Sequence, residues 1–359
     1  MNDDKTALEI VLGTYEEFLL GYSCFPNENK IEQTFATHSH SGSIRTVCTS
    51  GKYLASGGAD DRIFIYDLQL RKEQCALTHH NATVNCVAFT PENTHLISGS
   101  NDGVLAIVRV GSWQLEKVWE KAHKGSAILD IAVHTSGKLA LTLGADHSLC
   151  TWNLVKGRQA YVINLNNKSK DPKTLDRISW APCGVRFVLS GGKFTEIWSI
   201  EKGGVLNAVE HSDKVTCCAW LSNDTLVVGY ENGKLAKVNS DSSDIEMQEG
   251  RHTSRVKCMS VHNNYIITGA SQGDVKVWND DFEMVLESSS GCRITCLCVT
   301  DMVVKTETKE DSDYEAVEVH IPKTNTKSRR GVVTEEHDSD TEVIVPKKKS
   351  KKKKSKNKC

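Results

Sequence analysis

Five histidines recur along this chain at nearly constant spacing. They are His40, His80, His123, His211 and His252, and the intervals between them are 40, 43, 88 and 41 residues, where 88 is two intervals of 44. Most are followed by two apolar segments with a Gly-containing turn between them, the second ending near Trp or Tyr. Repeats of about 40–45 residues are typical of β-propellers of the WD type, in which each repeat forms a four-stranded blade. The spacing therefore predicts an all-β propeller.

The third repeat predicts a buried polar network. His123, Thr142, Asp146 and Trp152 occupy the positions of the four polar groups of a WD repeat. The Asp carboxylate can accept a proton from one ring nitrogen of the His. The other ring nitrogen and the indole N–H can both bond the Thr hydroxyl, so every buried polar atom has a partner. We expect this network to tie the loop before a blade to the turn inside it.

The other repeats keep this network to different degrees. The first repeat keeps His40, Ser56 and Asp60, with Tyr66 in the place of the Trp. The second repeat keeps His80, Ser98 and Asp102, with Val108-Arg109 in place of the Trp-Asp pair. The sixth keeps His252, Thr268 and Trp278 but has Gln272 where Asp is expected. The fifth keeps only His211, with Val228, Asn232 and Val238 in the other places. The fourth repeat has Trp198, no His and a shortened turn.

Six internal repeats leave one strand at the C-terminal end of the repeat region and three at the N-terminal end. The segment 293–304 is predicted to be one strand, and residues 8–36 are predicted to supply three more. Joining them gives a seventh blade and removes the open sheet edges that favour aggregation. The sequence therefore predicts a seven-bladed propeller over residues 1–304.

From residue 305 the composition changes. Residues 305–345 have eleven acidic and six basic residues with few aromatics, a composition that cannot bury enough apolar surface to fold. Residues 346–358 contain nine lysines. A terminal lysine block indicates nuclear or nucleolar import, although a solubilising tail is the alternative. We therefore expect a disordered tail over 305–359, with its import signal at Lys347, Lys348, Lys349, Lys351, Lys352, Lys353 and Lys354.

The remaining composition argues against several other classes of protein. Cys86, Cys217, Cys258 and Cys296 each lie two residues after the first apolar residue of a predicted blade, which suggests small buried thiols in a reducing compartment. Paired C-x-x-C motifs with partner ligands are missing, so we expect no metal. The sequence contains no run of 18 apolar residues, so no membrane association is predicted. It also lacks a P-loop and the common hydrolase motifs, so we expect no cofactor and no enzymatic activity.

A column of basic residues is the candidate partner-binding face. The residue before each inner strand of a propeller lies near the central channel, on the face that carries the inter-blade loops. In the last four repeats we assign this position to Arg177, Lys214, Arg255 and Arg293. A basic arc on a domain that is otherwise net acidic would suit an acidic or phosphate-bearing partner. Scattered solvated charges are the alternative.

Three strings resemble a known family: AHKGSAILDIAVHTSGKLALTLGADHSLCTWNLVKGRQA (122–160), HLISGSNDGVLAIVRV (95–110) and IVLGTYEEFLLGYSC near the N-terminus. They are similar to the p21-activated kinase-interacting WD-repeat proteins, over about residues 8–304. The resemblance implies a monomeric, non-catalytic nucleolar scaffold on precursors of the large (60S) ribosomal subunit, contacting their proteins or ribosomal RNA. An alternative is a signalling adaptor that restrains a p21-activated kinase.

Overall fold

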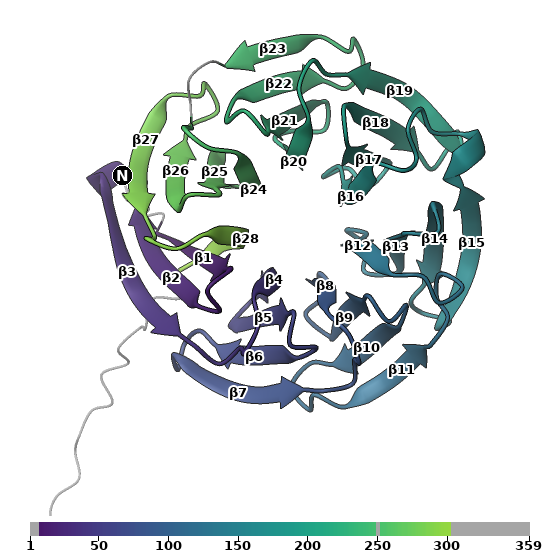
Figure 1. The fold of residues 1–359 in the computed structure, drawn as a ribbon, viewed down its shortest axis with the longest axis horizontal. Coiled ribbons are helices and arrows are strands. Elements are labelled where there is room, and N and C mark those ends of the chain that lie inside the picture. The colour runs from purple at the N-terminus through teal and green to yellow at the C-terminus, as the bar shows by residue number, and fades with distance from the viewer. Residues whose placement is uncertain (1–6, 249–251, 303–359) are drawn as a thin grey trace, which may run out of the picture. The chain divides into compact units, whose positions relative to one another are not determined.

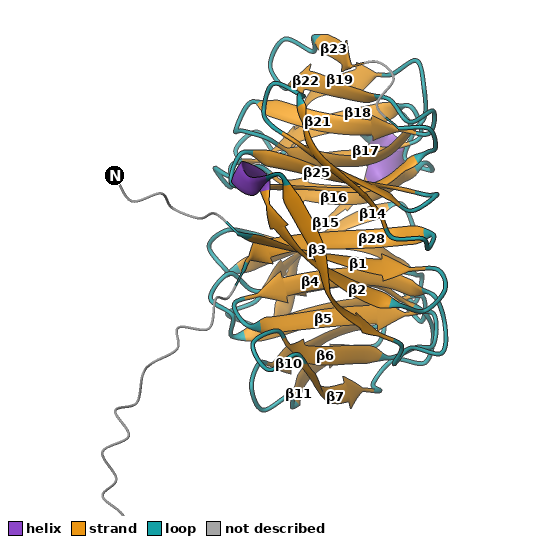
Figure 2. Ribbon diagram, turned by 90° about the vertical axis from the view of Figure 1, so that its left-hand side faces the viewer, coloured by secondary structure: helices purple, strands orange, loops and turns teal. Residues whose placement is uncertain are grey.

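The structure is a computed structural model that describes residues 7–248 and 252–302. These residues form seven four-stranded antiparallel sheets arranged in a ring around an open middle (Figure 1). Seen edge-on, the strands run from one face of the ring to the other and loops cover both faces (Figure 2). The prediction of an all-β, seven-bladed propeller is confirmed. Residues 305–359, predicted as a disordered tail, lie outside the described residues.

Blades one to three follow each other along the chain, each from its inner to its outer strand. Blade one consists of β4 (Ile44–Ser50), β5 (Tyr53–Gly58), β6 (Ile63–Asp67) and β7 (Lys72–Leu77). Blade two consists of β8 (Val84–Phe89), β9 (His95–Ser100), β10 (Leu105–Arg109) and β11 (Leu115–Trp119). Blade three consists of β12 (Ile128–Val133), β13 (Leu139–Gly144), β14 (Ser148–Asn153) and β15 (Arg158–Asn164).

Blades four to six repeat this order. Blade four consists of β16 (Leu175–Trp180), β17 (Arg186–Gly191), β18 (Phe194–Ser199) and β19 (Gly204–Glu210). Blade five consists of β20 (Val215–Trp220), β21 (Thr225–Tyr230), β22 (Leu235–Asn239) and β23 (Ile245–Gln248). Blade six consists of β24 (Val256–His262), β25 (Tyr265–Ala270), β26 (Asp274–Trp278) and β27 (Met284–Ser289). Two short 3-10 helices, η1 (Pro26–Glu28) and η2 (Leu165–Asn167), lie between strands.

Burial follows the position of a strand within its blade. The second strands read as continuous apolar and small residues, such as HLISGS and YIITGA, and almost every residue in them is buried. Neighbouring blades cover both faces of these strands, so no alternation with polar residues is needed. The outer strands β7, β11 and β15 are mostly exposed. The core therefore lies between blades.

A glycine on the second strand allows close packing in five blades. It lies opposite a small residue of the inner strand and against the first residue of the next blade, as in Gly13 with Cys296 and Ile44. A Cβ on Gly13 would lie 2.5 Å from the Cys296 Sγ and 2.6 Å from the Ile44 Cγ2. The other four pairs are Gly57 with Thr46, Gly99 with Cys86, Gly229 with Cys217, and Gly269 with Cys258. The repeated cysteines thus occupy a packing position.

Blades three and four depart from this pattern. The second strand there carries Leu143 or Ser190 in place of the glycine, and the inner strand carries Asp130 or Arg177 opposite it. Two adjacent blades therefore place charged side chains where the others place thiols or a threonine.

The inner strands are also joined across blades by side-chain hydrogen bonds. The second residue of an inner strand donates to the first carbonyl of the next blade in three places: Asn85 to Ile128 O (2.8 Å), Thr216 to Val256 O (2.5 Å) and Thr295 to Ile44 O (2.6 Å). Between blades three and four, Asp130 Oδ2 accepts from the Ile178 backbone N–H at 2.9 Å. These bonds hold neighbouring blades in register.

Blade seven contains strands from both ends of the described chain. Its order is β28 (Ile294–Asp301), β1 (Leu8–Thr14), β2 (Leu19–Phe25) and β3 (Lys30–Thr37). Strands β28 and β1 pair antiparallel, with Leu8 opposite Asp301. On the side of blade one, the buried Glu9 forms an ion pair with Arg71. The ring is therefore closed by non-local strand pairing together with a contact to the first blade.

This closure predicts the outcome of a circular permutation. The Met302 backbone N–H donates to Ala7 O at 2.8 Å, so a two-residue Asn-Gly hairpin can connect these residues. We expect a chain that starts at residue 38, runs to 302 and continues through Asn-Gly into 7–37 to be soluble and monomeric. A chain that starts at residue 38 and lacks 7–37 should aggregate, because β28 loses β1, the only strand that pairs with it in the described chain. Size-exclusion chromatography of the two proteins checks this, and a soluble, monomeric truncation would contradict it.

Candidate docking face

The predicted polar network of blade three is complete in the structure. The His123 Nδ1–H donates to Asp146 Oδ1 at 3.0 Å and lies 2.9 Å from the Ser148 hydroxyl oxygen. The Thr142 hydroxyl donates to His123 Nε2 at 2.7 Å and accepts from the Trp152 indole N–H at 2.8 Å. His123 and Thr142 are almost fully buried. The network links the loop before β12 to the turn between β13 and β14, and these lie on one face of the ring, which we call the histidine face.

The networks of blades one and two are less complete. In blade one, His40 Nδ1 lies 2.9 Å from Asp60 Oδ1 and His40 Nε2 lies 2.9 Å from the Ser56 hydroxyl. The Tyr66 hydroxyl is buried, but within the described part of the chain it has no hydrogen-bond partner.

In blade two, His80 Nε2 lies 2.8 Å from the Ser98 hydroxyl, whereas its Nδ1 is 3.4 Å from Asp102 Oδ2 without a hydrogen bond. His79 Nε2 contacts the same hydroxyl at 3.0 Å. Blade two therefore has a second histidine that bonds Ser98.

Blade five uses residues that the repeat pattern did not predict, whereas blade six uses the three that it did. His211 bonds Thr195 of blade four through Nε2 at 2.8 Å and the Tyr230 hydroxyl through Nδ1 at 2.9 Å. Neither Val228 nor Asn232, the residues aligned with the network, contributes. In blade six the Thr268 hydroxyl joins His252 and Trp278, each at 2.8 Å.

The carboxylate nearest to His252 is not at the aligned position 272. It belongs to Asp274, whose Oδ2 lies 3.7 Å from His252 Nδ1. Gln272 has no carboxylate, and its backbone N–H donates a hydrogen bond to the Ser254 hydroxyl oxygen at 3.2 Å.

Blade four replaces the missing histidine with a buried carboxylate. Glu196 of β18 has no exposed surface. Its Oε1 accepts from the Ser169 hydroxyl at 2.7 Å and from the Lys170 backbone N–H at 2.6 Å, while Oε2 accepts from the Trp198 indole N–H at 3.2 Å. Glu196 thus ties the loop before the blade to the blade's tryptophan. The only sign of this role of Glu196 in the sequence is its position two residues before Trp198.

Burial lowers the pKa of the histidines in blades two, three and five, which favours their neutral form. It lowers the pKa of His211 from 6.5 to about 4, and it is the main cause of the lowered pKa of His123 and His80. Burial raises the pKa of Asp146, but hydrogen bonds from Ser148 and His123 outweigh it, so the net shift is downward. Within the described residues, the His123 ring and the Asp146 carboxylate are engaged with each other inside blade three.

The structure corrects the predicted basic column at one position. Lys214, Arg255 and Arg293 lie immediately before β20, β24 and β28, as predicted. In blade four that position is Thr174, because β16 begins at the buried Leu175. Arg177 is the third residue of β16 and lines the central channel. The predicted arc of four therefore has three members, on blades five, six and seven.

The error at Arg177 has an identifiable cause. The assignment of Arg177 to the position before the strand required the strand to start at Ile178. In the other blades the first buried residue is followed three positions later by a second apolar one, as in Val84 and Val87 or Ile128 and Ile131. Leu175 and Ile178 fit that spacing, so the signal was present in the sequence.

The three basic residues of the column have few competing contacts. Lys214 and Arg293 are exposed. The Arg293 guanidinium lies over the exposed ring of Tyr15, 5.2 Å from its centroid. Arg255 Nη1 lies 3.8 Å from Glu231 Oε1, a distance at which a surface ion pair contributes little. A cation beside an aromatic ring suits docking of an acidic or phosphate-bearing group.

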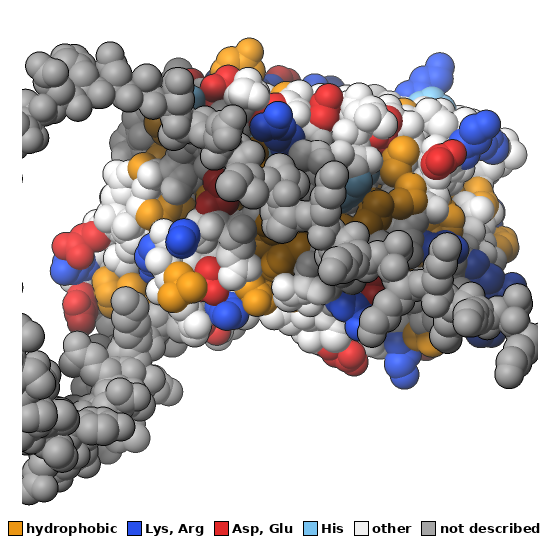
Figure 3. Space-filling view, turned by 90° about the horizontal axis from the view of Figure 1, so that it is seen from below, with side chains coloured by type: hydrophobic (Ala, Val, Ile, Leu, Met, Phe, Trp, Pro, Cys, Tyr) orange, Lys and Arg blue, Asp and Glu red, His pale blue; other side chains and the backbone are white. Residues whose placement is uncertain are grey.

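The outer wall of the ring is different in character. On the part visible in Figure 3, which views the ring from below Figure 1, basic and acidic side chains are interspersed.

No cluster of three or more His, Cys, Asp or Glu that could hold a metal ion occurs in residues 7–248 and 252–302. The same residues contain no helix long and apolar enough to cross a membrane. The predicted import lysines, Lys347 to Lys354, lie outside the described residues.

Comparison with known proteins places the chain in a family. The WD domain, G-beta repeat model matches residues 29–67, 71–107, 204–236 and 248–279. A Gallus gallus protein named p21-activated protein kinase-interacting protein 1-like is 30% identical, covering 81% of this chain and 80% of the relative. A Danio rerio protein of the same name is 29% identical over 86% and 84%. Shk1 kinase-binding protein 15 of Schizosaccharomyces pombe is 29% identical over 81% and 83%.

Seven blades, the histidine networks and the matched repeats define a WD-repeat β-propeller. The 30% identity with the chicken protein extends across most of both chains, so the similarity covers more than the matched repeats. The chain belongs to the p21-activated protein kinase-interacting protein 1 family.

The completeness of each network predicts the cost of removing its histidine. His123→Ala should lower the free energy of unfolding by about 2–4 kcal/mol, because a buried ring and its bonds to Asp146 and Thr142 are lost. His80→Ala should cost less, because His79 still bonds Ser98 and His80 has no bond to Asp102. Urea titration of both variants measures the difference. Equal losses, or the reverse order, would show that the network does not act as a unit.

The lowered pKa of His211 predicts a pH dependence of stability. Between pH 6.5 and about 4 the unfolded chain binds a proton at this residue and the folded chain does not, so stability falls as the pH falls. His211→Gln should remove this contribution, which reaches about 1.4 kcal/mol per pH unit. Urea titrations at pH 7, 6 and 5 should therefore show a shallower decline for His211→Gln than for the unmodified protein. Parallel declines would mean that His211 is protonated in the fold.

Proposed function

We propose that the protein is a non-catalytic scaffold that acts in nucleolar assembly of the large (60S) ribosomal subunit and in the accompanying processing of its RNA. The observation that carries the proposal is the column Lys214, Arg255 and Arg293, aligned on one face across three adjacent blades. A precursor particle offers phosphates and acidic side chains as partners for such a column. The resemblance of residues 8–304 to a family of assembly scaffolds supports the same function.

A second function, regulation of a p21-activated kinase, is favoured by the names of the relatives. The chicken and zebrafish proteins are named for interaction with p21-activated kinase, and the fission yeast protein for binding Shk1 kinase. A propeller that binds a kinase would use the same exposed loops. Both functions need docking and neither needs catalysis by this chain.

We place the protein in the nucleus and nucleolus because of its lysine-rich end. Nine lysines in residues 346–358 match the composition of basic import signals. The segment also carries enough charge to contact the phosphate backbone of RNA in a salt-dependent way.

Charge reversal tests the basic column. Arg255→Glu combined with Arg293→Glu should lower the affinity for large-subunit precursors by about 100-fold or more, because like charges at an interface cost several kcal/mol. Co-sedimentation with the precursors should then be lost. The melting temperature should fall only slightly, because Arg293 is exposed and the half-buried Arg255 loses one hydrogen bond to Ser271 (3.3 Å) and a 3.8 Å contact with Glu231. Sucrose-gradient fractionation of tagged variants measures the association.

The matched control is Lys72→Glu with Lys138→Glu. Both lysines are exposed, one on the outer strand β7 and the other in the turn between β12 and β13, on the opposite face. This variant should co-sediment normally. If the Arg255/Arg293 variant also does, the column is not the contact. Loss of kinase binding with normal co-sedimentation would favour the second function.

The lysine-rich end predicts where a shortened chain accumulates. A fluorescent fusion that lacks residues 346–359 should move from the nucleolus toward the cytoplasm. The measurement is the nuclear-to-cytoplasmic ratio, because a chain of 39.7 kDa can still enter nuclei slowly. An unchanged ratio would remove these lysines from the localisation argument.

A further inference from the structure

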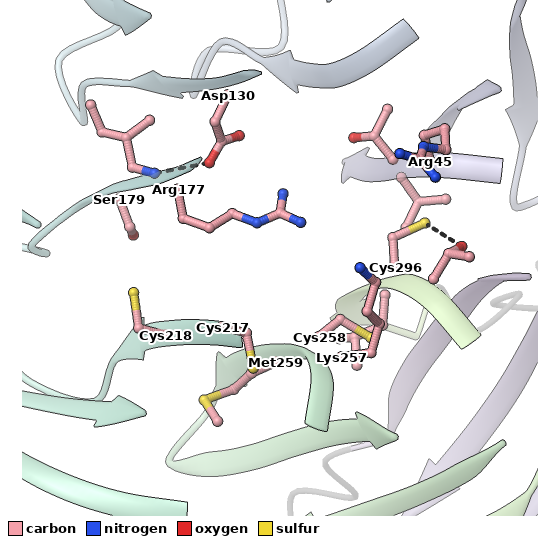
Figure 4. A pocket seen from close by; sticks show the side chains of 15 residues that line it. Arg45, Asp130, Arg177, Ser179, Cys217, Cys218, Lys257, Cys258, Met259 and Cys296 are labelled. Atoms are coloured by element: carbon pink, nitrogen blue, oxygen red, sulfur yellow. Dashed lines mark hydrogen bonds between the residues drawn. The ribbon is translucent and has the colours of Figure 1, made fainter. Parts of the chain in front are cut away.

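The central channel contains three basic side chains that converge from three blades. Two adjoining cavities of about 180 and 260 Å³ share four lining residues, Arg45, Arg177, Lys257 and Thr295. Figure 4 shows Arg177 extending from β16 into the opening, with Lys257 and Arg45 on the opposite side. Arg45 belongs to β4 of blade one and Lys257 to β24 of blade six. The three cations therefore face one shared space.

None of the three cations has a hydrogen bond or ion pair with any residue in 7–248 or 252–302. Two guanidinium groups and one ammonium together carry thirteen N–H donors, five on each arginine and three on the lysine. Burial and the nearby charges of Arg177, Arg255 and Arg45 lower the pKa of Lys257. Like charges that are held together without partners cost free energy, which a bound anion would recover.

Burial lowers the pKa of Arg177, but the charges of Asp130 and Asp176 outweigh it, so the acidic groups of the channel offset the three cations only in part. Asp130 uses both carboxylate oxygens on backbone N–H groups, Oδ1 on Ile131 at 3.0 Å and Oδ2 on Ile178 at 2.9 Å. Asp176 lines one of the two cavities, but no ion pair joins it to Arg177 or Lys257 in the part of the chain that the structure describes. With both carboxylates ionised, three positive charges still face two negative ones.

The thiols of the channel add no negative charge. Burial raises the pKa of Cys217 to about 12, and it raises the pKa of Cys218 and Cys296 to about 11 each. They are neutral at physiological pH. The Thr295 hydroxyl is already bonded to Ile44 O, so the charged donors of the cavity are those of the three cations.

We propose that the channel of this protein binds a phosphate group, held by Arg45, Arg177 and Lys257. A phosphate offers several acceptor oxygens and more than one negative charge to donors that arrive from three directions, whereas a carboxylate has two oxygens and one charge. The cavities are of a size for a small oxyanion or a small phosphorylated molecule and lie inside the ring. None of the three residues of the basic column lines these cavities, and the proposal does not depend on the proposed scaffold function.

Melting curves with defined anions test the site. Inorganic phosphate and pyrophosphate, each compared with chloride at equal ionic strength, should raise the melting temperature of the unmodified protein in a saturable way. A larger effect of pyrophosphate would indicate a ligand with linked phosphates, and a larger effect of phosphate would indicate the free ion or a monoester. The absence of saturable stabilisation by either anion at millimolar concentration would overturn the proposal.

Variants separate a binding site from general charge screening. Lys257→Gln and Arg45→Gln should each weaken phosphate binding by roughly tenfold to a hundredfold, as expected for the loss of one charge-assisted contact. Lys257→Gln should melt no lower than the unmodified protein in chloride, because repulsion is relieved, and Lys257→Arg should keep the phosphate response. The matched control is Lys72→Gln on the outer strand β7, which should respond normally. A normal phosphate response in both Lys257→Gln and Arg45→Gln would overturn the assignment.

Discussion

The pairing of β28 with β1 is the constraint on which the ring depends. Each internal blade is a local structure whose strands follow one another along the chain, but a ring needs one pairing between the two ends of the propeller sequence. Leu8 to Gly13 lie opposite Asp301 to Cys296, so the closing contact spans almost the whole described chain. The contact of Gly13 with Cys296 and Ile44 then packs blade seven against blade one as the other blades pack against each other. Closure also gives β28 its partner strand β1, so β28 is not left as an isolated strand.

The polar networks show how the same mechanical role is filled by different residues. Every one of the first six blades ties the loop before it to a buried group of a blade, yet the full set of His, Thr, Asp and Trp occurs only in blade three among the described residues. In blade four the Glu196 carboxylate ties the preceding loop to the blade. Before blade five, His211 makes this tie by bonding Thr195 and Tyr230. Buried polar atoms need partners of the right geometry, not a particular residue type. This tolerance explains why the repeat decays in sequence while the fold persists.

The channel illustrates how a local exception creates a site. Five blades pair a second-strand glycine with a thiol or threonine, and their inner strands present little charge to the channel at that position. Where Leu143 and Ser190 replace the glycine, Asp130 and Arg177 take the inner position. Asp130 links two blades through backbone N–H groups, whereas Arg177 projects into the opening. A packing position in five blades thus carries a charged group in the other two.

The sequence by itself determined the class of fold, because a period of about 40–45 residues and glycine-bounded apolar segments are local properties that one repeat shares with the next. It also determined the complete network of blade three, whose four residues lie within 30 positions of one another in the printed sequence. The use of Glu196 and the convergence of Arg45, Arg177 and Lys257 on one space were decided only by the tertiary structure. These features depend on where a strand begins after an irregular loop and on which side chains of blades one, four and six meet across the ring. Residues that far apart in sequence become neighbours only when the ring closes.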